Sequence, residues 1–567
     1  PPPPSPSPPS PSPPPLPSPP PSSSPPPSPS PSLPSLSPPP SSPSPPPTPP
    51  SPLPPSPSPP LPWPPSPPPA PLPSPSPPST GATLRPTIPS WAEAEEFSLS
   101  LARFDEWHDA LTTIEHTTAA GEGVRAVHSS GGAAGGVVSE GQGYGLFLGG
   151  AIVAVLPRGH ARRAELTSRA YEYFLGWRKM CELTAADSCQ EHALCGGEGE
   201  ARHECLPSWK FDDRLTAEIG TGSATDGDAD AILGMLLLVL ATEYDSPRPA
   251  WWASVAQWTY QSSRAFLEHL SETHPTLTAS NGQPLRMLKL GSCWGGWGCN
   301  NPSYHSPGHF RAFRDFMLKF APAYGASDGE GARLAPQWDA LIETTHQLLD
   351  ENQCAATGLT TNWWVPRFGR TPSDAEVRDC AHSGTPASEY GAEASRTSWR
   401  VTAAALWYDT PAAARFARRV GAHATDALRH YGRNGCYSIG GCPQLALDVG
   451  CHVTSIHDDW IYNGFMLAPT ASALVLALDG GAPLAQHQQA ALDSAAGLLS
   501  LRAASDYYSG SWVMIGTFTI SGDLQKLAAV LERLARGFSP SPPPPVPSRP
   551  SLPAPAPAPP PSPSPPP

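Results

Sequence analysis

The sequence predicts an all-α fold in which one helical domain lies between two proline-rich arms. Residues 1–80 hold 47 of the 83 prolines and residues 540–567 hold 17, so proline is concentrated at the two ends of the 567-residue chain. Apart from Arg549 these ends are uncharged, so the net charge of −14 belongs to the middle. We expect three parts, namely an arm at 1–88, a helical domain at 89–538 and a tail at 539–567.

The N-terminal arm repeats Ser-Pro and Ser-Pro-Pro-Pro units. Proline has no backbone N–H to donate, and this composition favours polyproline II conformation, so we expect both arms to be disordered spacers. The repeats resemble the Ser/Pro-rich, extensin-like modules of plant and green-algal wall glycoproteins, which implies association with a cell wall or matrix. A plain linker is the alternative. A platform for SH3-type domains is disfavoured because Arg and Lys are scarce beside the PxxP units.

The middle segment shows helical periodicity. Leu334, Trp338, Leu341 and Leu348 fall on one face of a helix, as do apolar residues between 166 and 177. Strand-like alternation is scarce. Further helices are expected at 143–156, 231–241, 254–272, 307–320, 398–407 and 473–478. The loops between them are rich in glycine and aromatic residues, as at 291–304, and suit a carbohydrate cleft, although most of the 17 tryptophans are expected in the core.

Composition excludes two classes of partner. The acidic balance, with a pI of about 5.6, argues against nucleic acid and against anionic membrane surfaces, both of which call for clustered Lys and Arg. The longest uncharged apolar stretches, 143–156 and 231–241, are shorter than the roughly 20 residues that span a bilayer. We expect an extracellular or cell-wall protein, with no visible signal peptide in a sequence that begins at Pro1.

Eleven cysteines lie in the middle segment. In a secreted protein they would form disulfides with one cysteine left over. A zinc site that uses Cys195, His203 and Cys205, or Cys451 with His452, is the alternative, but no CxxC pair supports it. We expect no metal or other cofactor.

Three acidic segments stand out in the middle of the chain. Glu140 lies among small and apolar residues at 137–145, surroundings that raise a carboxyl pKa as a proton donor requires. Three aspartates, beginning with Asp226, precede the apolar run at 232–240 and form a second candidate segment for the chemistry. The alternative is that Thr225 or Asp226 only caps a helix.

The third acidic segment centres on Glu393. Arg396 follows it by one helical turn and would keep it ionised. The plain alternative is an ordinary surface pair at i, i+3 spacing.

In this order the segments resemble glycoside hydrolase family 8. The similarity rests on Ser-Glu-Gly at 139–141 and Ala-Thr-Asp-Gly-Asp at 224–228, and extends to Trp209-Lys210, Trp294-Gly-Gly-Trp297, Asn301-Pro-Ser-Tyr304, 358–363 and Tyr507-Tyr508. The resemblance implies an (α/α)6 barrel of six inner and six outer helices. It also implies an endo-acting glycosidase that cleaves β-1,4-linked polysaccharide with inversion.

The resemblance also implies roles for individual residues. Glu140 matches the general acid, Asp226 the aspartate that grips the sugar at the cleavage point, and Glu393 the general base. Inversion calls for an acid and a base about 6.5 to 9.5 Å apart, and Glu140 and Glu393 are expected to meet that spacing. The residues expected to bind substrate are Tyr144, Trp209, Trp294, Trp297, Tyr304, Trp363, Arg396 and Tyr508.

One departure bears on activity. Glu393 stands where the family usually places aspartate, and the extra methylene displaces the carboxylate by about 1 Å, which can cost on the order of 100-fold in rate. Asp374, Asp379 and Asp409 are conceivable substitutes. Two other functions therefore stay open: a non-catalytic or weakly active carbohydrate-binding wall protein, and a different α/α-barrel enzyme such as a lyase or a hydrolase of acidic or amino sugars.

Overall fold

The computed structural model describes residues 98–129, 135–184, 206–381, 383–431, 451–456, 460–476, 478, 482–504 and 506–535. The arm at 1–88, the tail at 539–567 and their boundaries lie outside these residues and stay predictions. Within the described residues the chain is dominated by α-helices, and no strand is longer than eight residues.

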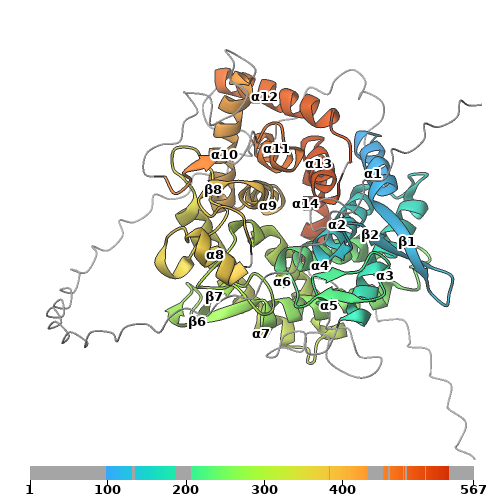
Figure 1. Ribbon diagram of the computed structural model, residues 1–567. Helices are drawn as coiled ribbons and strands as arrows, with labels where there is room; N and C mark the ends of the chain where they lie inside the picture. Colours follow the sequence, from blue (N-terminus) through green and yellow to red (C-terminus); the bar gives the residue numbers. More distant parts are fainter. Residues whose placement is uncertain are drawn as a thin grey trace, which may run out of the picture. The chain divides into compact units, whose positions relative to one another are not determined.

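Six helices form a closed inner ring in which each packs against the next. They are α2 (Ser139–Val155), α4 (Thr225–Thr242), α6 (Pro307–Tyr324), α9 (Ala392–Tyr408), α11 (Gly464–Ala471) and α13 (Tyr507–Ile520). Figure 1 shows these six following one another around the ring in this order.

Six further helices pack on the outside of the ring. They are α1 (Ser98–Leu111), α3 (Arg163–Leu183), α5 (Trp252–His269), α7 (Glu330–Asn352), α10 (Pro411–His430) and α12 (Ala482–Ser500). Outer and inner helices alternate along the chain, so each outer helix returns the chain to the same end of the ring. The predicted (α/α)6 barrel is confirmed.

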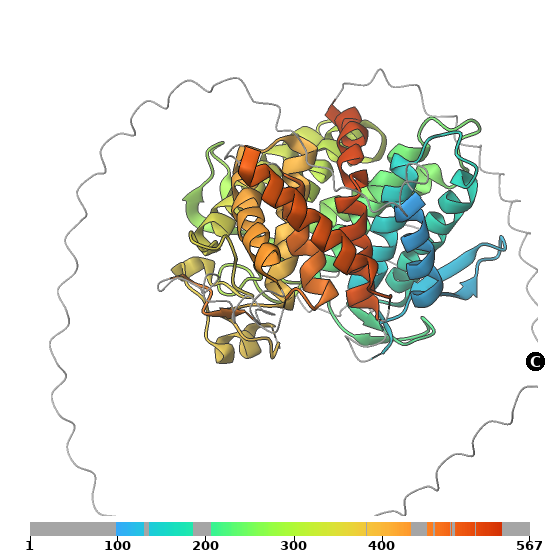
Figure 2. The same ribbon diagram turned by 90° about the horizontal axis from the view of Figure 1, so that it is seen from above.

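Helix α14 (Asp523–Ala535) closes one end of the ring, where it contacts α2, α4, α6, α9 and α13. Trp407, near the end of α9, donates its Nε1–H to Leu524 O, and Arg533 donates to Leu240 O near the end of α4. Figure 2 shows the reddest segment, α14, at the upper edge and the yellow loops that carry α8 (Asp374–Ala381) at the lower edge. The N-terminal ends of the inner helices therefore face the end opposite α14.

Helices α2 and α4 approach each other unusually closely because glycines face glycines. A Cβ on Gly143 would lie 2.5 Å from Gly227 O, and a Cβ on Gly150 would lie 2.3 Å from Gly234 O. A Cβ on Gly227 would lie 2.6 Å from the backbone nitrogen of Glu140. Any side chain at these positions would push the two helices apart, so the glycines bring the starts of α2 and α4 together.

Short strands shape the entries to the inner helices. Strand β3 (Val137–Val138) leads into α2 and pairs with β4 (Lys210–Phe211), which pairs with β5 (Glu218–Gly220); β8 (Glu389–Tyr390) leads into α9 and pairs with β9 (Ser455–Ile456). Two antiparallel hairpins lie elsewhere, β1 (Thr112–Thr117) with β2 (Gly123–Val127) and β6 (Ser271–Thr278) with β7 (Pro284–Leu288). The short 3₁₀ helices are η2 (Pro302–Tyr304), η3 (Pro366–Phe368) and η5 (Ser472–Val475).

Two local predictions are wrong. The segment 473–478 is not an α-helix: η5 ends at Val475, and Leu476 is extended. Neither Thr225 nor Asp226 caps α4, because Ala224 holds the N-cap position and makes no side-chain cap bond. The polar residues at that start are therefore free for another role. The prediction that most tryptophans are core residues is confirmed, since 11 of the 15 described ones are buried.

Two disulfides join described residues, Cys299–Cys380 and Cys354–Cys451. Cys451 is thereby excluded as a zinc thiolate, while Cys195, His203 and Cys205 lie outside the described residues. The described helices include none that combines the length and the apolarity needed to cross a bilayer.

Candidate active site

Three carboxylates converge at the end of the ring opposite α14. Glu140, Asp226 and Glu393 are each the second residue of their helix, α2, α4 and α9. A helix N-terminus carries partial positive charge and favours an anionic side chain. The barrel topology therefore gathers three acidic groups that are up to 253 positions apart in the sequence.

Arg396 connects all three carboxylates. Its Nη1 donates to Glu140 Oε1 at 2.5 Å and to Asp226 Oδ2 at 2.8 Å, and its Nη2 donates to Glu393 Oε2. The guanidinium is buried, with 3% of the Arg396 side chain exposed. The alternative of an ordinary surface pair with Glu393 does not hold, because Arg396 is buried and is the shared counter-ion of the whole cluster. One guanidinium therefore separates Glu140 from Glu393.

Glu140 is held by three donors. Besides Arg396, Tyr144 donates its hydroxyl to Oε1 at 2.7 Å and Tyr507 donates to Oε2 at 3.0 Å. Burial, reinforced by the nearby charge of Asp226, raises the pKa of Glu140 to about 7, although Arg396 and Tyr144 pull it down. At neutral pH this carboxyl group exchanges a proton readily, as a general acid must.

Glu393 keeps one oxygen open. Asn301 donates its Nδ2–H to Oε2 at 2.7 Å, the same oxygen that Arg396 contacts. Among the described residues no donor contacts Oε1, and 23% of the Glu393 side chain is exposed. An accessible carboxylate oxygen without a donor can accept a proton from water, which suits a general base.

The Asp226 carboxylate bonds both to Arg396 and to the backbone of its own helix. Its Oδ1 accepts from the backbone N–H of Gly227 at 2.9 Å, which leaves Oδ2 for Arg396. The rings of Tyr304 and Tyr508 lie 5.3 and 5.8 Å from the Arg396 guanidinium carbon, within cation–π range. These rings, with Tyr507, make the surroundings of the cluster aromatic.

A second ion pair lies one helical turn deeper in the ring. Arg400 on α9 binds Asp230 on α4 with both terminal nitrogens, at 2.8 and 2.9 Å, and also donates to Ser306 Oγ at 3.0 Å. His309 on α6 donates its Nε2–H to Asp230 at 3.0 Å, a tautomer inferred from the hydrogen bond. Burial by itself raises the pKa of Asp230, but Arg400 and His309 outweigh it and hold the value at about 2.

The structure brings some of the expected substrate-binding residues together and not others. Tyr304, Arg396 and Tyr508 surround the carboxylates. Trp209 is half-buried beside the entry to α2, where its carbonyl oxygen accepts from Ser139 N at 2.9 Å.

Trp294 and Trp297 are also half-buried in the loop before η2. Trp294 packs against the small core around Leu290 and Trp363, while Trp297 packs edge-on against His274 of β6. Their expected role stays a prediction.

Two of these expectations are corrected. Tyr144 is fully buried and bonded to Glu140, so it positions a carboxylate instead of presenting a surface to substrate. Trp363 is 3% exposed and packs between Leu290 and Val377, so it is a core residue.

Sequence reasoning missed three residues of the site. Tyr507 and Asn301 were quoted only as parts of motifs, yet each binds a carboxylate directly. Asn362 accepts from Gly391 N at 3.1 Å and from Ala394 N at 2.9 Å, and so secures the start of α9 beneath Glu393. The motif at 358–363 contained this asparagine, but only the fold shows which helix it supports.

Part of the chain is similar in sequence to curated endoglucanases. Endoglucanase C of Ruminiclostridium cellulolyticum is 24% identical over 211 residues, and Endoglucanase A of Acetivibrio thermocellus is 26% identical over 196 residues. The chain resembles endoglucanases. These alignments cover 36% and 33% of this chain and 36% and 31% of the relatives, so the chain spans about a third of the length of the curated relatives it matches. No family model matches the chain.

A likeness of fold extends further along the chain. The solved structure of a β-1,3-1,4-glucanase from Paenibacillus sp. X4 superposes with a TM-score of 0.52 and 16% identity, and the match covers 78% of this chain and 96% of that one. The barrel fold inferred from the motifs is therefore confirmed.

Proposed function

We propose that this protein is an extracellular, endo-acting glycoside hydrolase that cleaves a β-1,4-linked glucan with inversion. The observation that carries the proposal is the cluster of Glu140, Asp226 and Glu393 around Arg396 at the end of the barrel opposite α14. The likeness to named endoglucanases supports a glucan as substrate. The two disulfides support an oxidising, extracellular setting.

In this mechanism Glu140 is the general acid. With a pKa of about 7 it holds a proton below neutral pH and donates it to the glycosidic oxygen as the bond to the anomeric carbon breaks. Tyr144 and Tyr507 hold both carboxyl oxygens in place during the transfer. The leaving sugar departs as a neutral alcohol.

Glu393 is the general base. Its Oε1, which has no donor among the described residues, accepts a proton from a water molecule whose oxygen attacks the anomeric carbon from the face opposite the leaving group. Arg396 and Asn301 hold Oε2 and so orient the carboxylate. The product has inverted anomeric configuration and a new reducing end.

Asp226 acts on the sugar at the cleavage point. With Oδ1 held by Gly227 N and Oδ2 by Arg396, its carboxylate is fixed at the start of α4 next to Glu140. A fixed carboxylate can accept hydrogen bonds from sugar hydroxyls and favour the distorted ring of the transition state.

The test is a substrate panel with purified protein. Soluble cellulose, mixed-linkage β-1,3-1,4-glucan, xylan and chitosan are assayed for new reducing ends, and NMR of the first product reads its anomeric configuration. Glu140→Gln is expected to lower kcat by about 10³-fold while leaving glucan binding intact. Glu165→Gln, at an exposed position of α3, is the matched control and is expected to keep full activity.

Each outcome separates the alternatives. Retention of glucan without cleavage by the parent protein would identify a carbohydrate-binding wall protein instead of an enzyme. Cleavage of chitosan alone would identify a different barrel enzyme, a hydrolase of amino sugars. A Glu140→Gln variant as active as the parent would overturn the assignment of the acid.

A further inference from the structure

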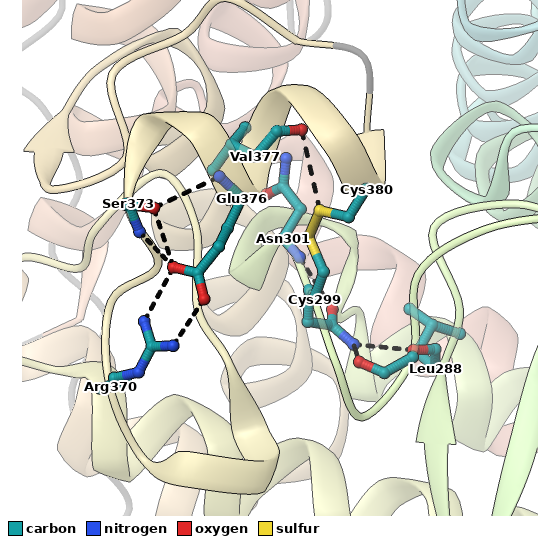
Figure 3. The surroundings of a disulfide bond; sticks show 10 residues. Leu288, Cys299, Asn301, Arg370, Ser373, Glu376, Val377 and Cys380 are labelled. Atoms are coloured by element: carbon teal, nitrogen blue, oxygen red, sulfur yellow. Dashed lines mark hydrogen bonds and ion pairs between the residues drawn. A yellow bond between two sulfur atoms is a disulfide. The ribbon is translucent and has the colours of Figure 1, made fainter. Parts of the chain in front are cut away.

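The Cys299–Cys380 disulfide lies two residues from Asn301, which donates a hydrogen bond to the candidate base Glu393. It joins the loop before η2 to α8 across 81 residues of sequence, and it belongs to a small core with Leu290, Trp363 and Val377. Figure 3 shows this disulfide with Asn301 next to it. Asn301 follows Cys299 by two residues, so the covalent link anchors the segment that supplies a hydrogen bond to Glu393.

Asn301 is oriented at both ends of its amide. Its Nδ2 donates to Glu393 Oε2 at 2.7 Å, and its Oδ1 accepts from Ser303 N at 2.9 Å and from Ser303 Oγ at 2.8 Å. Asn300 beside it exchanges two backbone hydrogen bonds with Trp364, at 2.7 and 2.9 Å. The amide can therefore reach Glu393 only while the 299–301 segment keeps its place.

The other half of the disulfide is tied to the start of α9. Asp374, at the start of α8, accepts from Ala387 N at 2.8 Å, and Asn362 donates to Pro386 O at 2.8 Å. The same Asn362 accepts from Gly391 N and Ala394 N, on either side of Glu393. Two segments far apart in the sequence, one carrying Asn301 and one leading to Glu393, are thus joined covalently through Cys299 and Cys380.

We propose that the Cys299–Cys380 disulfide and Asn301 form a clamp that positions the Glu393 carboxylate for catalysis. Asn301 is a positioning residue: it acts through Glu393 and fixes which oxygen faces the water. The disulfide acts through Asn301 by holding the two segments together. This role rests on the proposed function, in which Glu393 is the base.

The second disulfide provides a matched control. Cys354–Cys451 closes a loop of 97 residues, against 81 for Cys299–Cys380, so the two constrain the unfolded chain almost equally. It joins the segment after α7 to the segment before β9, where His452 packs edge-on against Trp364 and β9 pairs with β8, and it makes no covalent link to the segment that carries Asn301. Loss of either disulfide is expected to lower stability alike, whereas only loss of Cys299–Cys380 is expected to change the chemistry.

The experiment compares Asn301→Ala, Cys299→Ala/Cys380→Ala and Cys354→Ala/Cys451→Ala with the parent in kcat, KM and the pH–rate profile on soluble glucan. Asn301→Ala and the first double variant are expected to lower kcat about tenfold at unchanged KM. Both are also expected to move the acidic limb of the pH–rate profile, where the base becomes protonated, to higher pH. The reason is that a carboxylate that loses a donor binds a proton more readily. The control double variant is expected to keep the parent's profile. Equal profiles for the two double variants would overturn the clamp.

A second measurement covers the case of a Cys299→Ala/Cys380→Ala variant that does not fold and the case of a parent that does not cleave. The folded parent is treated with a reductant, and hydrogen exchange is followed at the backbone amides of 391–396. If the parent cleaves no glucan, the proposed function fails, whereas the hydrogen-exchange measurement still tests the clamp. Faster exchange on loss of Cys299–Cys380, but not in the Cys354/Cys451 variant, supports the clamp; unchanged exchange overturns it.

Discussion

The ring contains two layers of acidic and basic residues that use the same residue types for different purposes. Helix α4 presents Asp226 and, one turn deeper, Asp230; helix α9 presents Arg396 and, one turn deeper, Arg400. In the outer layer three carboxylates share the Arg396 guanidinium. In the inner layer a single aspartate takes both terminal nitrogens of Arg400 and a hydrogen bond from a histidine.

The ratio of acids to cations separates the two layers. At the outer layer burial and the charge of the neighbouring Asp226, which the shared Arg396 only partly offsets, raise the pKa of Glu140 to about 7. Full pairing at the inner layer lowers the pKa of Asp230 to about 2 despite complete burial. A proton is therefore exchangeable at neutral pH in the outer layer and excluded from the inner one. We infer that the outer layer is built for proton transfer and the inner layer for holding α4 and α9 in register.

The largest effect is expected from Arg396→Met. Loss of the shared cation leaves three carboxylates in mutual repulsion, so kcat is expected to fall by about 10³-fold. The pKa of Glu140 is expected to rise further, because Arg396 lowers it in the parent, and the alkaline limb of the pH–rate profile moves up accordingly. Steady-state kinetics from pH 5 to 9 measures both. An unchanged kcat would show that the outer layer takes no part in catalysis.

Glu393→Asp tests whether the outer layer needs the longer side chain. The structure places the Glu393 carboxylate in contact with both Arg396 and Asn301, and shortening it by one methylene withdraws it from these donors. We expect kcat to fall on the order of 100-fold, with the same anomeric product. An aspartate variant faster than the parent would mean that the parent's base is misplaced.

Arg400→Met is the inner-layer counterpart of the first variant. It leaves Asp230 buried without its cation, so we expect urea unfolding to show a loss of about 3 kcal/mol in stability. The folded variant is expected to keep the alkaline limb of its pH–rate profile near pH 7. If Arg400→Met shifted the alkaline limb of the pH–rate profile and left the stability unchanged, the roles assigned to the two layers would be wrong.

The stability that the inner layer contributes also depends on pH. Because Asp230 has a lowered pKa in the folded protein, its ionised form contributes stability above the ordinary value of 3.8, and this contribution is lost as pH falls toward about 2. The shift corresponds to about 2 kcal/mol. Asp230→Asn is therefore expected to be less stable than the parent at pH 6, with a gap that narrows steadily between pH 4 and 2 in urea titrations.

The smallest effect is expected in the pH–rate profile of the parent protein itself. In the proposed mechanism the protonated form of Glu140 is the active one, and its fraction falls as pH rises through about 7. We expect kcat/KM to fall about tenfold per pH unit above that point. Flat activity from pH 6 to 9 would show that Glu140 does not supply the proton.

Much of the site was accessible from local sequence. An acid among glycines at Glu140, an acid before an apolar run at Asp226 and an acid one turn from an arginine at Glu393 were each recognisable. The glycines at 143 and 150, spaced by seven like those at 227 and 234, also encode the close packing of α2 and α4. The inner-layer pair was not recognised, because Asp230 and Arg400 look like ordinary helix residues until their helices face each other.

Local sequence was enough to predict most of the helices, the aromatic loops and the candidate acids, because these depend on neighbours within a few positions. The fold was needed to show that Arg396 bonds to three carboxylates, that Tyr144 and Trp363 are buried, and that Asn301 reaches Glu393. Such contacts depend on which helix ends meet across the ring. That meeting is set by the packing of whole helices, which a short sequence window does not contain.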